Sequence, residues 1–161
     1  MAGRFLSTND LRTFETFNKE LIGDLRLSKD GIINQTITLY KVSAEHTSTN
    51  LYGESTGGKT YKPGVKFACM IESGDVDFTQ DEFGADSLQD ATFFMLRETL
   101  TDLELVPDLG DIIDWNYAHF EINGINENQL IGGMYDQNWS VNCTAHLIRS
   151  VSLQIENIRK V

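Results

Sequence analysis

Residues 53–60 have the letters of a nucleotide-binding loop, because they read G-x-x-x-x-G-K-T. In such a loop the backbone amides hold phosphates and the lysine reaches the terminal phosphate groups. The motif has to follow a buried strand and open into a helix. Here residues 43–50 are not an apolar strand, and Pro63 and Gly64 follow, through which a helix cannot continue. We therefore interpret the match as accidental and expect no bound nucleotide.

The histidines and cysteines are too scattered to predict a metal site. His46, His119 and His146 lie far apart and have no acidic residue at metal-binding spacing. Cys69 and Cys143 fall in strand-like runs at apolar positions, where a free cysteine packs as a small buried hydrophobe. His146 comes three residues after Cys143, which places the two on opposite faces of a strand. We expect no metal ion, and the unpaired thiols indicate a reducing compartment.

The sequence also has no pattern of nucleophilic or acid–base catalysis. The serines lie in Gly-Glu-Ser and Asn-Trp-Ser contexts, without the strand–turn–helix pattern of a catalytic serine. Paired acids such as Asp81 and Glu82 lie in a polar segment rather than in an apolar pocket that would shift their pKa values. We predict no catalytic residue and no cofactor, and expect a protein that is not an enzyme.

The charge balance argues against tight binding to nucleic acid. Of 161 residues, 24 are acidic and 13 basic, which gives a formal net charge of −11. Phosphate binding requires clustered lysine and arginine, and these residues are dispersed here. An acidic wall along which DNA passes without binding is compatible with this charge, although solubility alone is the simpler explanation. No apolar run approaches the roughly 20 residues of a membrane span, and residues 1–10 do not read as a signal peptide.

A helix is predicted over residues 9–26, as the first of the elements that would position a functional site. Asn9 or Asp10 is the expected cap, and Gly31 lies in the turn that ends the segment. The helix has an apolar stripe at helical spacing, made of Leu11, Phe14, Leu21, Ile22 and Leu25. The stripe fits equally well a helix that packs on its own core and one that packs on a neighbouring subunit.

After Gly31 apolar and polar residues alternate, which predicts half-buried strands. A strand also begins at residues 76–78, and residues 97–105 predict a short helix. The other alternating strands are predicted at residues 33–42, 65–71 and 139–147, and the last of these extends toward residue 153. Residues 91–96 are apolar and aromatic throughout and predict a buried strand.

The connections between the strands are polar. Residues 107–111 predict a turn, and residues 112–122 predict a hairpin that turns at Asn116 and Tyr117, because asparagine tolerates a positive φ. Three longer segments predict loops, namely residues 43–64, 81–90 and 124–138. The acidic segment 81–90 is expected to be a solvated loop, with a binding loop as the alternative.

These elements predict a single, mainly β domain over residues 1–161. The expected architecture is a small antiparallel β-barrel or sandwich with an N-terminal helix and long loops. Its parts are the helix at 9–26, the barrel body at 32–150 with an assembly loop at 43–64, and a C-terminal tail at 151–161.

Two segments resemble a known family. The first reads Asn50-Leu51-Tyr52-Gly53-Glu54-Ser55 and continues to Lys59 and Tyr61; the second reads Leu105-Val106-Pro107-Asp108-Leu109-Gly110-Asp111-Ile112-Ile113. Both are similar to segments of the neck proteins of T4-type and related contractile-tailed bacteriophages. Phe120-Glu121-Ile122 and Asn126-Glu127-Asn128-Gln129 continue the likeness. The resemblance covers residues 9–133, and residues 134–161 depart from the family pattern.

The resemblance implies a structural virion protein located at the head–tail junction and made in the host cytoplasm. Such proteins form a ring that closes the DNA-filled head and joins the portal to the tail, without catalytic activity or cofactor. The implied partners are other copies of the chain, as a hexamer or less commonly a dodecamer, a portal or adaptor protein on the head side, and a tail-terminator or tail protein on the tail side. DNA would pass through the channel without specific binding, and no membrane is involved.

A ring subunit needs loops that reach its neighbours, and tyrosine supplies a large contact area at low entropic cost. The interface candidates are therefore Tyr52, Glu54, Lys59, Tyr61, Trp115 and Tyr117.

Three other functions remain as alternatives. A tail-terminator or baseplate component would share the fold. A small-ligand or carbohydrate-binding β domain would use Trp115, Tyr117 and Trp139 as an aromatic platform. A hydrolase is the weakest alternative, because no motif supports it.

Overall fold

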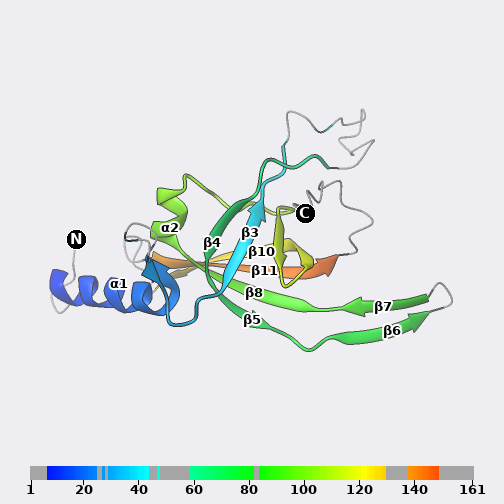
Figure 1. The fold of residues 1–161 in the computed structure, drawn as a ribbon, viewed down its shortest axis with the longest axis horizontal. Coiled ribbons are helices and arrows are strands. Elements are labelled where there is room, and N and C mark those ends of the chain that lie inside the picture. The colour runs from blue at the N-terminus through cyan, green and yellow to red at the C-terminus, as the bar shows by residue number, and fades with distance from the viewer. Residues whose placement is uncertain are drawn as a thin grey trace.

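The computed structural model describes residues 7–24, 27, 29–43, 47, 59–81, 84–129 and 138–148. These residues form a mainly β body with one N-terminal helix and a long projecting hairpin (Figure 1). The predicted tail at 151–161 and the glycines at 132 and 133 lie outside the described residues.

Helix α1 (Thr8–Ile22) begins at a capping box. The Ser7 hydroxyl accepts a hydrogen bond from the Asp10 amide, and the Asp10 carboxylate accepts one from the Ser7 amide, both at 3.2 Å. The helix ends because Gly23 takes a φ of 133°, a conformation that glycine tolerates and other residues rarely adopt. The predicted helix was thus too long at its C-terminal end, and its cap is Ser7 rather than residue 9 or 10.

The segment after α1 folds back against the end of the helix. Strands β1 (Gly23–Asp24) and β2 (Lys29–Asp30) form a two-stranded sheet. The Ile32 amide donates to the Glu20 carbonyl at 3.0 Å. Gly31 lies so close to the helix end that a Cβ there would be 2.2 Å from the carbonyl carbon of Ile22. Only glycine fits at this approach.

The body is a seven-stranded antiparallel sheet that curls into a half-barrel, which confirms the predicted fold class. The strands lie in the order β4-β3-β9-β10-β11-β8-β5. Their bounds are β3 Thr36–Tyr40, β4 Val65–Ala68, β5 Met70–Ser73, β8 Asp90–Leu96, β9 Ile112–Trp115, β10 Ala118–Gln129 and β11 Asn138–Ile148.

The two outermost strands of this sheet, β4 and β5, follow each other in the chain with only Cys69 between them. The sequence predicted a single strand over 65–71, and its apolar alternation is real. The chain bends at Cys69, so β4 pairs with β3 while β5 pairs with β8. A single bent segment therefore connects both ends of the curled sheet.

The core fills the concave side of the sheet with aliphatic and aromatic side chains. Phe93 and Phe120 are fully buried, with ring centroids 5.8 Å apart. Cys69 and Cys143 are free and buried, as predicted. Burial raises the pKa of both thiols to about 12, so they remain protonated and pack as apolar groups.

The hairpin predicted over residues 112–122 is confirmed. Trp115 and Ala118 are paired across a two-residue turn in which Asn116 and Tyr117 have φ values of 51° and 63°. Strand β10 then extends to Gln129, into the segment predicted as a loop. That prediction was wrong because backbone pairing with β11, which continues to Asn138, holds the polar residues in strand form.

A second hairpin, β6 (Asp77–Asp81) and β7 (Gly84–Leu88), replaces the acidic loop predicted over 81–90. It continues β5 and β8 outward, since the Gly74 amide donates to the Asp90 carbonyl at 2.8 Å. Acidic residues do not prevent this pairing, because the ladder uses only backbone groups. The short helix predicted within 97–105 is α2 (Arg97–Asp102).

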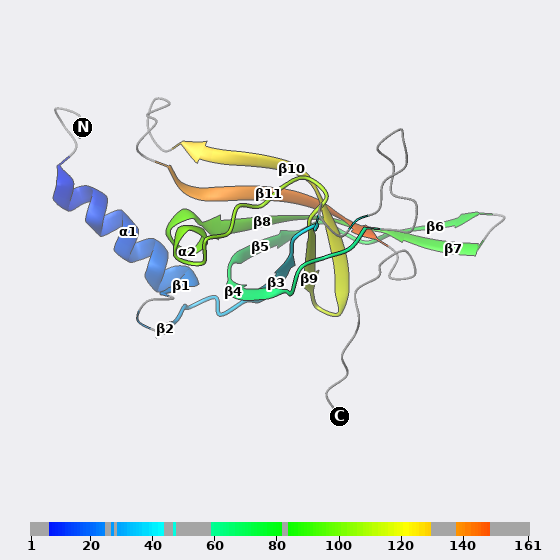
Figure 2. The ribbon, with the colours of Figure 1, turned by 90° about the horizontal axis from the view of Figure 1, so that it is seen from above.

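Helix α1 and the β6–β7 hairpin lie at opposite ends of the longest axis, with the curled sheet between them (Figures 1 and 2). Ile22 is the buried residue of α1. Along the helix, the Phe14 ring packs on Trp139 at 5.3 Å between centroids. In the part of the chain described here, no helix is long and apolar enough to cross a membrane.

Candidate assembly site

The described ends of the predicted loop 43–64 leave the body as an antiparallel pair. Val42 and Tyr61 form a β-bridge. The Ser43 amide donates to the Thr60 carbonyl, and the Lys62 amide donates to the Lys41 carbonyl, both at 2.8 Å. The base of the loop thus extends β3 and β4. Tyr52 and Glu54, two of the interface candidates, lie outside the described residues.

The buried carboxylate of Asp111 fastens this base to the turn predicted at 107–111. Asp111 is 1% exposed. Its two oxygens accept hydrogen bonds from the amides of Val42 and Asp108, each at 2.9 Å. Burial raises the pKa of the Asp111 carboxyl above its ordinary value, while the two amides and nearby Lys41 act in the opposite direction.

Two lysines add ionic contacts on either side of Asp111. The Lys41 Nζ lies 2.7 Å from Asp108 Oδ2 and also donates to the Val106 carbonyl. The Lys59 Nζ lies 2.6 Å from Glu121 Oε1 on β10. We call Lys41, Lys59, Asp108, Asp111 and Glu121 the loop clamp. It joins residues more than sixty positions apart in the sequence.

The geometry of Lys59 also bears on the nucleotide-loop motif. Its ammonium group is bound to a carboxylate of its own chain. The residues after Thr60 form the Tyr61 bridge and strand β4, with no helix at this position. The structural context that a phosphate-binding loop requires is therefore missing at its described end.

Tyr61 is half-buried at the centre of this region. Burial raises the pKa of its phenol to about 12, and the negative charges of Glu121 and Asp111 contribute to the rise. The hydroxyl therefore stays neutral at physiological pH. The two segments of the neck-protein resemblance meet here, because Lys59 and Tyr61 belong to the first and Asp108 and Asp111 to the second.

The remaining interface candidates have contrasting surroundings. Tyr117 is fully exposed at the tip of the β9–β10 turn. Trp115 is turned toward the core, where its ring centroid lies 6.3 Å from that of Phe93 and 5.9 Å from that of Phe120. Trp139 instead contacts α1. The three aromatic residues of the proposed carbohydrate platform thus have different neighbours among the described residues.

Exposed apolar side chains at the two ends of the molecule form a feature that sequence reasoning only half anticipated. On α1, Phe17 is 60% exposed, and Phe14 and Leu21 are partly exposed. On the projecting hairpin, Phe78 is 80% exposed. The wide stripe of the helix signalled the first group. The sequence predicted a strand that begins at residues 76–78, but it did not signal that Phe78 would stay exposed on a projecting hairpin.

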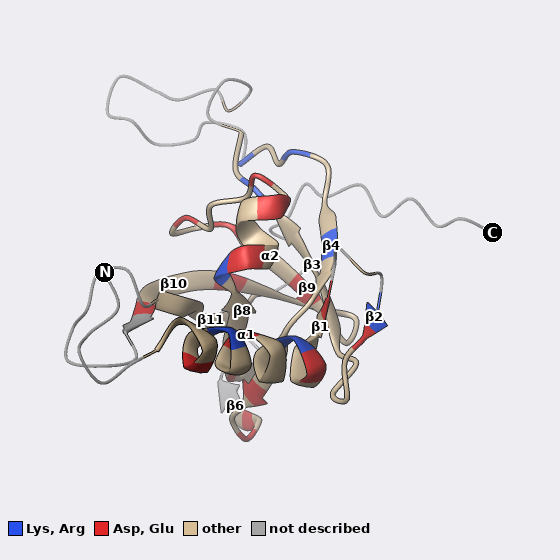
Figure 3. Cartoon of the chain, turned by 90° about the vertical axis from the view of Figure 1, so that its left-hand side faces the viewer, with Lys and Arg blue, Asp and Glu red and all other residues tan. Residues whose placement is uncertain are grey.

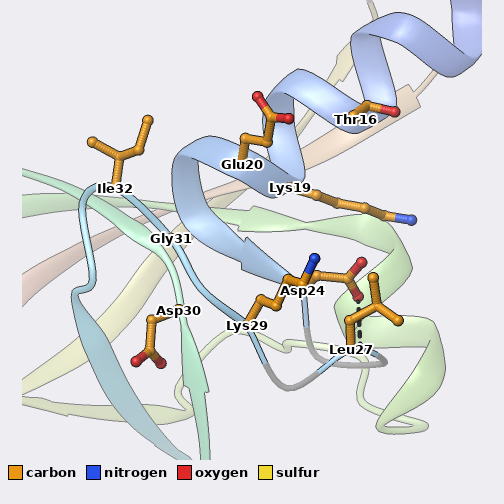
Figure 4. A pocket seen from close by; sticks show the side chains of 9 residues that line it. All are labelled: Thr16, Lys19, Glu20, Asp24, Leu27, Lys29, Asp30, Gly31 and Ile32. Carbon is orange, nitrogen blue, oxygen red and sulfur yellow. Dashed lines mark hydrogen bonds between the residues drawn. The ribbon is translucent and has the colours of Figure 1, made fainter.

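A cavity of about 670 Å³ lies beside α1, between the helix and the β1–β2 segment (Figure 4). Its walls carry charges of both signs, from Lys19, Glu20, Asp24, Lys29 and Asp30. The Lys19 ammonium lies 2.7 Å from Glu98 on α2, which raises the lysine pKa. Within the described residues, no cluster of histidine, cysteine and carboxylate side chains could hold a metal ion.

Neither a scan of protein-family models nor a search of curated protein sequences finds a match to this chain.

Proposed function

We propose that this chain is a structural subunit of a bacteriophage neck, assembling into a ring that closes the head and joins portal to tail. The observation that carries the proposal is the placement of exposed apolar side chains at opposite ends of the subunit, on α1 and on the β6–β7 hairpin. On the hairpin side Val76 and Leu88 are exposed together with Phe78. Exposed apolar side chains that gather on one surface mark protein–protein contacts. Two different patches on opposite ends favour heterologous contacts, which generate rings when the rotation closes.

The loop clamp supports the same proposal. Its residues hold the base of the 43–64 loop with a buried carboxylate and two ion pairs. The described ends of the loop are thereby fixed on the body, which lowers the entropic cost of binding a neighbouring subunit there. The two sequence segments similar to neck proteins meet at this clamp, although no local pattern brings them together.

The chemistry of the subunit suits a passive channel component. The net charge of −11 repels DNA phosphates, so a ring with acidic walls would let DNA pass without binding it. The proposed partners are other copies of this chain, a portal or adaptor protein, and a tail or tail-terminator protein.

The test is the mass of the purified chain in solution, combined with electron microscopy of the particles. A ring of six or twelve copies is expected, and antibody labelling should place the protein at the head–tail junction of virions. Labelling at the far end of the tail would replace the neck by a baseplate. A monomer that binds sugar and is absent from virions would overturn the proposal in favour of a ligand-binding domain.

A further inference from the structure

Strand β4 (Val65–Ala68) and the segment 59–64 before it, which forms a single β-bridge at Tyr61, are paired on one side only. On that side they contact β3 and residues 41–43. Their other side, which we call the β4 edge, has no strand partner in the described part of the chain, since β4 is the outermost strand of its sheet. An unpaired edge exposes backbone donors and acceptors to which another strand can add. Lysines and a proline such as Pro63 on a short edge hinder pairing with strands in general. A strand that adds here therefore has to offset the lysine charge.

All the charged residues of this segment are lysines. Lys59 is bound in the loop clamp, whereas Lys62 and Lys66 are exposed. Figure 3 looks at the α1 end of the molecule and shows basic positions on β4 and on the chain segment that leads into it. A stretch with three lysines and no acid is notable in a chain with 24 acidic and 13 basic residues.

The β6–β7 hairpin has the opposite charge. Residues 75–90 contain six acidic residues and no lysine or arginine. Asp75, Asp77 and Asp90 are exposed. Strand β6 pairs only with β7, so its outer edge also lacks a partner among the described strands. The hairpin points away from its own body in two perpendicular views (Figures 1 and 2).

These two edges complement each other in backbone geometry and in charge. Two copies of so acidic a chain repel one another over most of their surfaces, so an attractive contact has to use a segment with the opposite sign. The β4 edge is such a segment, and the hairpin supplies the strand that matches it. Since the two surfaces are different, the contact can repeat from copy to copy.

We infer that the β4 edge receives the β6–β7 hairpin of a second copy of this chain, which adds to the sheet with Lys62 and Lys66 near Asp75 and Asp77. The inference rests on the proposed ring function and specifies its subunit contact. The hairpin of each copy reaches the next body, and Phe78 becomes covered in the process.

Charge reversal tests this contact. The double variants Lys62→Glu/Lys66→Glu and Asp75→Lys/Asp77→Lys should each remain monomeric at concentrations at which the unmodified chain forms rings. We expect at least about a tenfold weakening of assembly, because each variant places like charges opposite one another. Sedimentation measures the assembly, and circular dichroism checks that each variant is folded.

Mixing the two variants gives the sharper result. The Lys62→Glu/Lys66→Glu variant keeps an acidic hairpin, which fits the unmodified lysine edge of the Asp75→Lys/Asp77→Lys variant. The lysine-bearing hairpin of Asp75→Lys/Asp77→Lys in turn fits the glutamate edge of Lys62→Glu/Lys66→Glu. An equimolar mixture should therefore form rings in which the two variants alternate. A single chain carrying all four substitutions should also assemble by itself.

The single variant Lys66→Glu should also weaken assembly. Its matched control is Lys29→Glu, which makes the same charge change on an exposed residue of β2. It should leave assembly intact. The inference is overturned if the control weakens assembly as much as Lys66→Glu does, or if both double variants form rings like the unmodified chain. In the latter case the ring itself stands and only this contact fails, whereas an unmodified chain that forms no ring overturns the proposed function as well.

Discussion

The loop clamp and the β6–β7 hairpin both carry charged residues, but these residues differ in the contacts that they make with the rest of the chain. In the clamp, the carboxylates of Asp108, Asp111 and Glu121 contact amides or lysines of the same chain. In the hairpin, Asp75 and Asp77 are exposed. The clamp is therefore complete within one subunit, and the hairpin has the properties of a surface that another molecule completes.

The largest effect on the free energy of unfolding is expected from a comparison of two phenylalanines, one in the core and one on the hairpin. Phe93 is fully buried in the half-barrel, while Phe78 is 80% exposed on the hairpin. Phe93→Ala should lower the free energy of unfolding by about 3–5 kcal/mol, because it leaves a cavity in the core. Phe78→Ala should change it by less than about 0.5 kcal/mol. Denaturant unfolding of the monomer measures both, and a comparable loss at position 78 would show that the hairpin packs on its own body.

The Asp111 carboxylate should give the next largest effect. Asp111→Ala removes the acceptor of two amide hydrogen bonds in a buried place, and we expect a loss of about 3 kcal/mol. Asp108→Ala is the comparison, because that carboxylate is largely exposed and its ion pair with Lys41 should contribute at most about 1 kcal/mol. Thermal unfolding distinguishes the two. Equal losses would mean that burial of Asp111 is not what holds the loop base.

The ion pair between Lys59 and Glu121 is only partly shielded, with side chains 42% and 29% exposed. A double-mutant cycle with Lys59→Met and Glu121→Gln should give a coupling free energy of about 0.5–1 kcal/mol. High salt should reduce this coupling, because water reaches both groups. A coupling of zero would show that this ion pair does not help to hold the loop base.

The smallest effect concerns Tyr61 and appears at alkaline pH. Its pKa is raised from 10.0 to about 12 in the folded chain, so the unfolded chain releases this proton first. Tyr61 therefore contributes a decrease in stability as the pH rises from about 10 to about 12. Tyr61→Phe should remove that contribution, and an ultraviolet titration of the unmodified chain should show a late-ionising tyrosine that the variant lacks. If the variant instead lacks a tyrosine that ionises near the ordinary value of 10.0, Tyr61 lies in water and its half-buried placement is contradicted.

The sequence alone predicted those helices, strands and turns in which the conformation of each residue depends on its immediate neighbours. The apolar and aromatic run over 91–96 identified a buried strand. Asn116 identified the hairpin turn, because a positive φ is a local requirement. The cysteines were predicted as buried for the same reason. The helix end was missed, since the apolar stripe continued past Gly23 and only the backbone conformation there shows the stop.

Long-range pairing could not be predicted in this way. The alternation over 65–71 predicts an extended chain. It does not predict that the chain bends at Cys69, so that its two halves form the two outermost strands of one sheet. Likewise the acidic residues of 81–90 resemble those of a loop. Their strand form depends on partners in β6, and the backbone groups that make such a ladder are the same for every residue type.

The sequence by itself therefore determined the mainly β class, the turn at Asn116, the burial of the core residues and the absence of a workable phosphate-loop context after Pro63. Only the tertiary structure decided that Lys59 meets Glu121, that Asp111 fastens Val42, and that apolar and acidic residues of the β6–β7 hairpin extend from the body. The physical reason is that periodicity reports which face of a strand is apolar, whereas the partner of a charge or an edge is set by how the whole sheet curls.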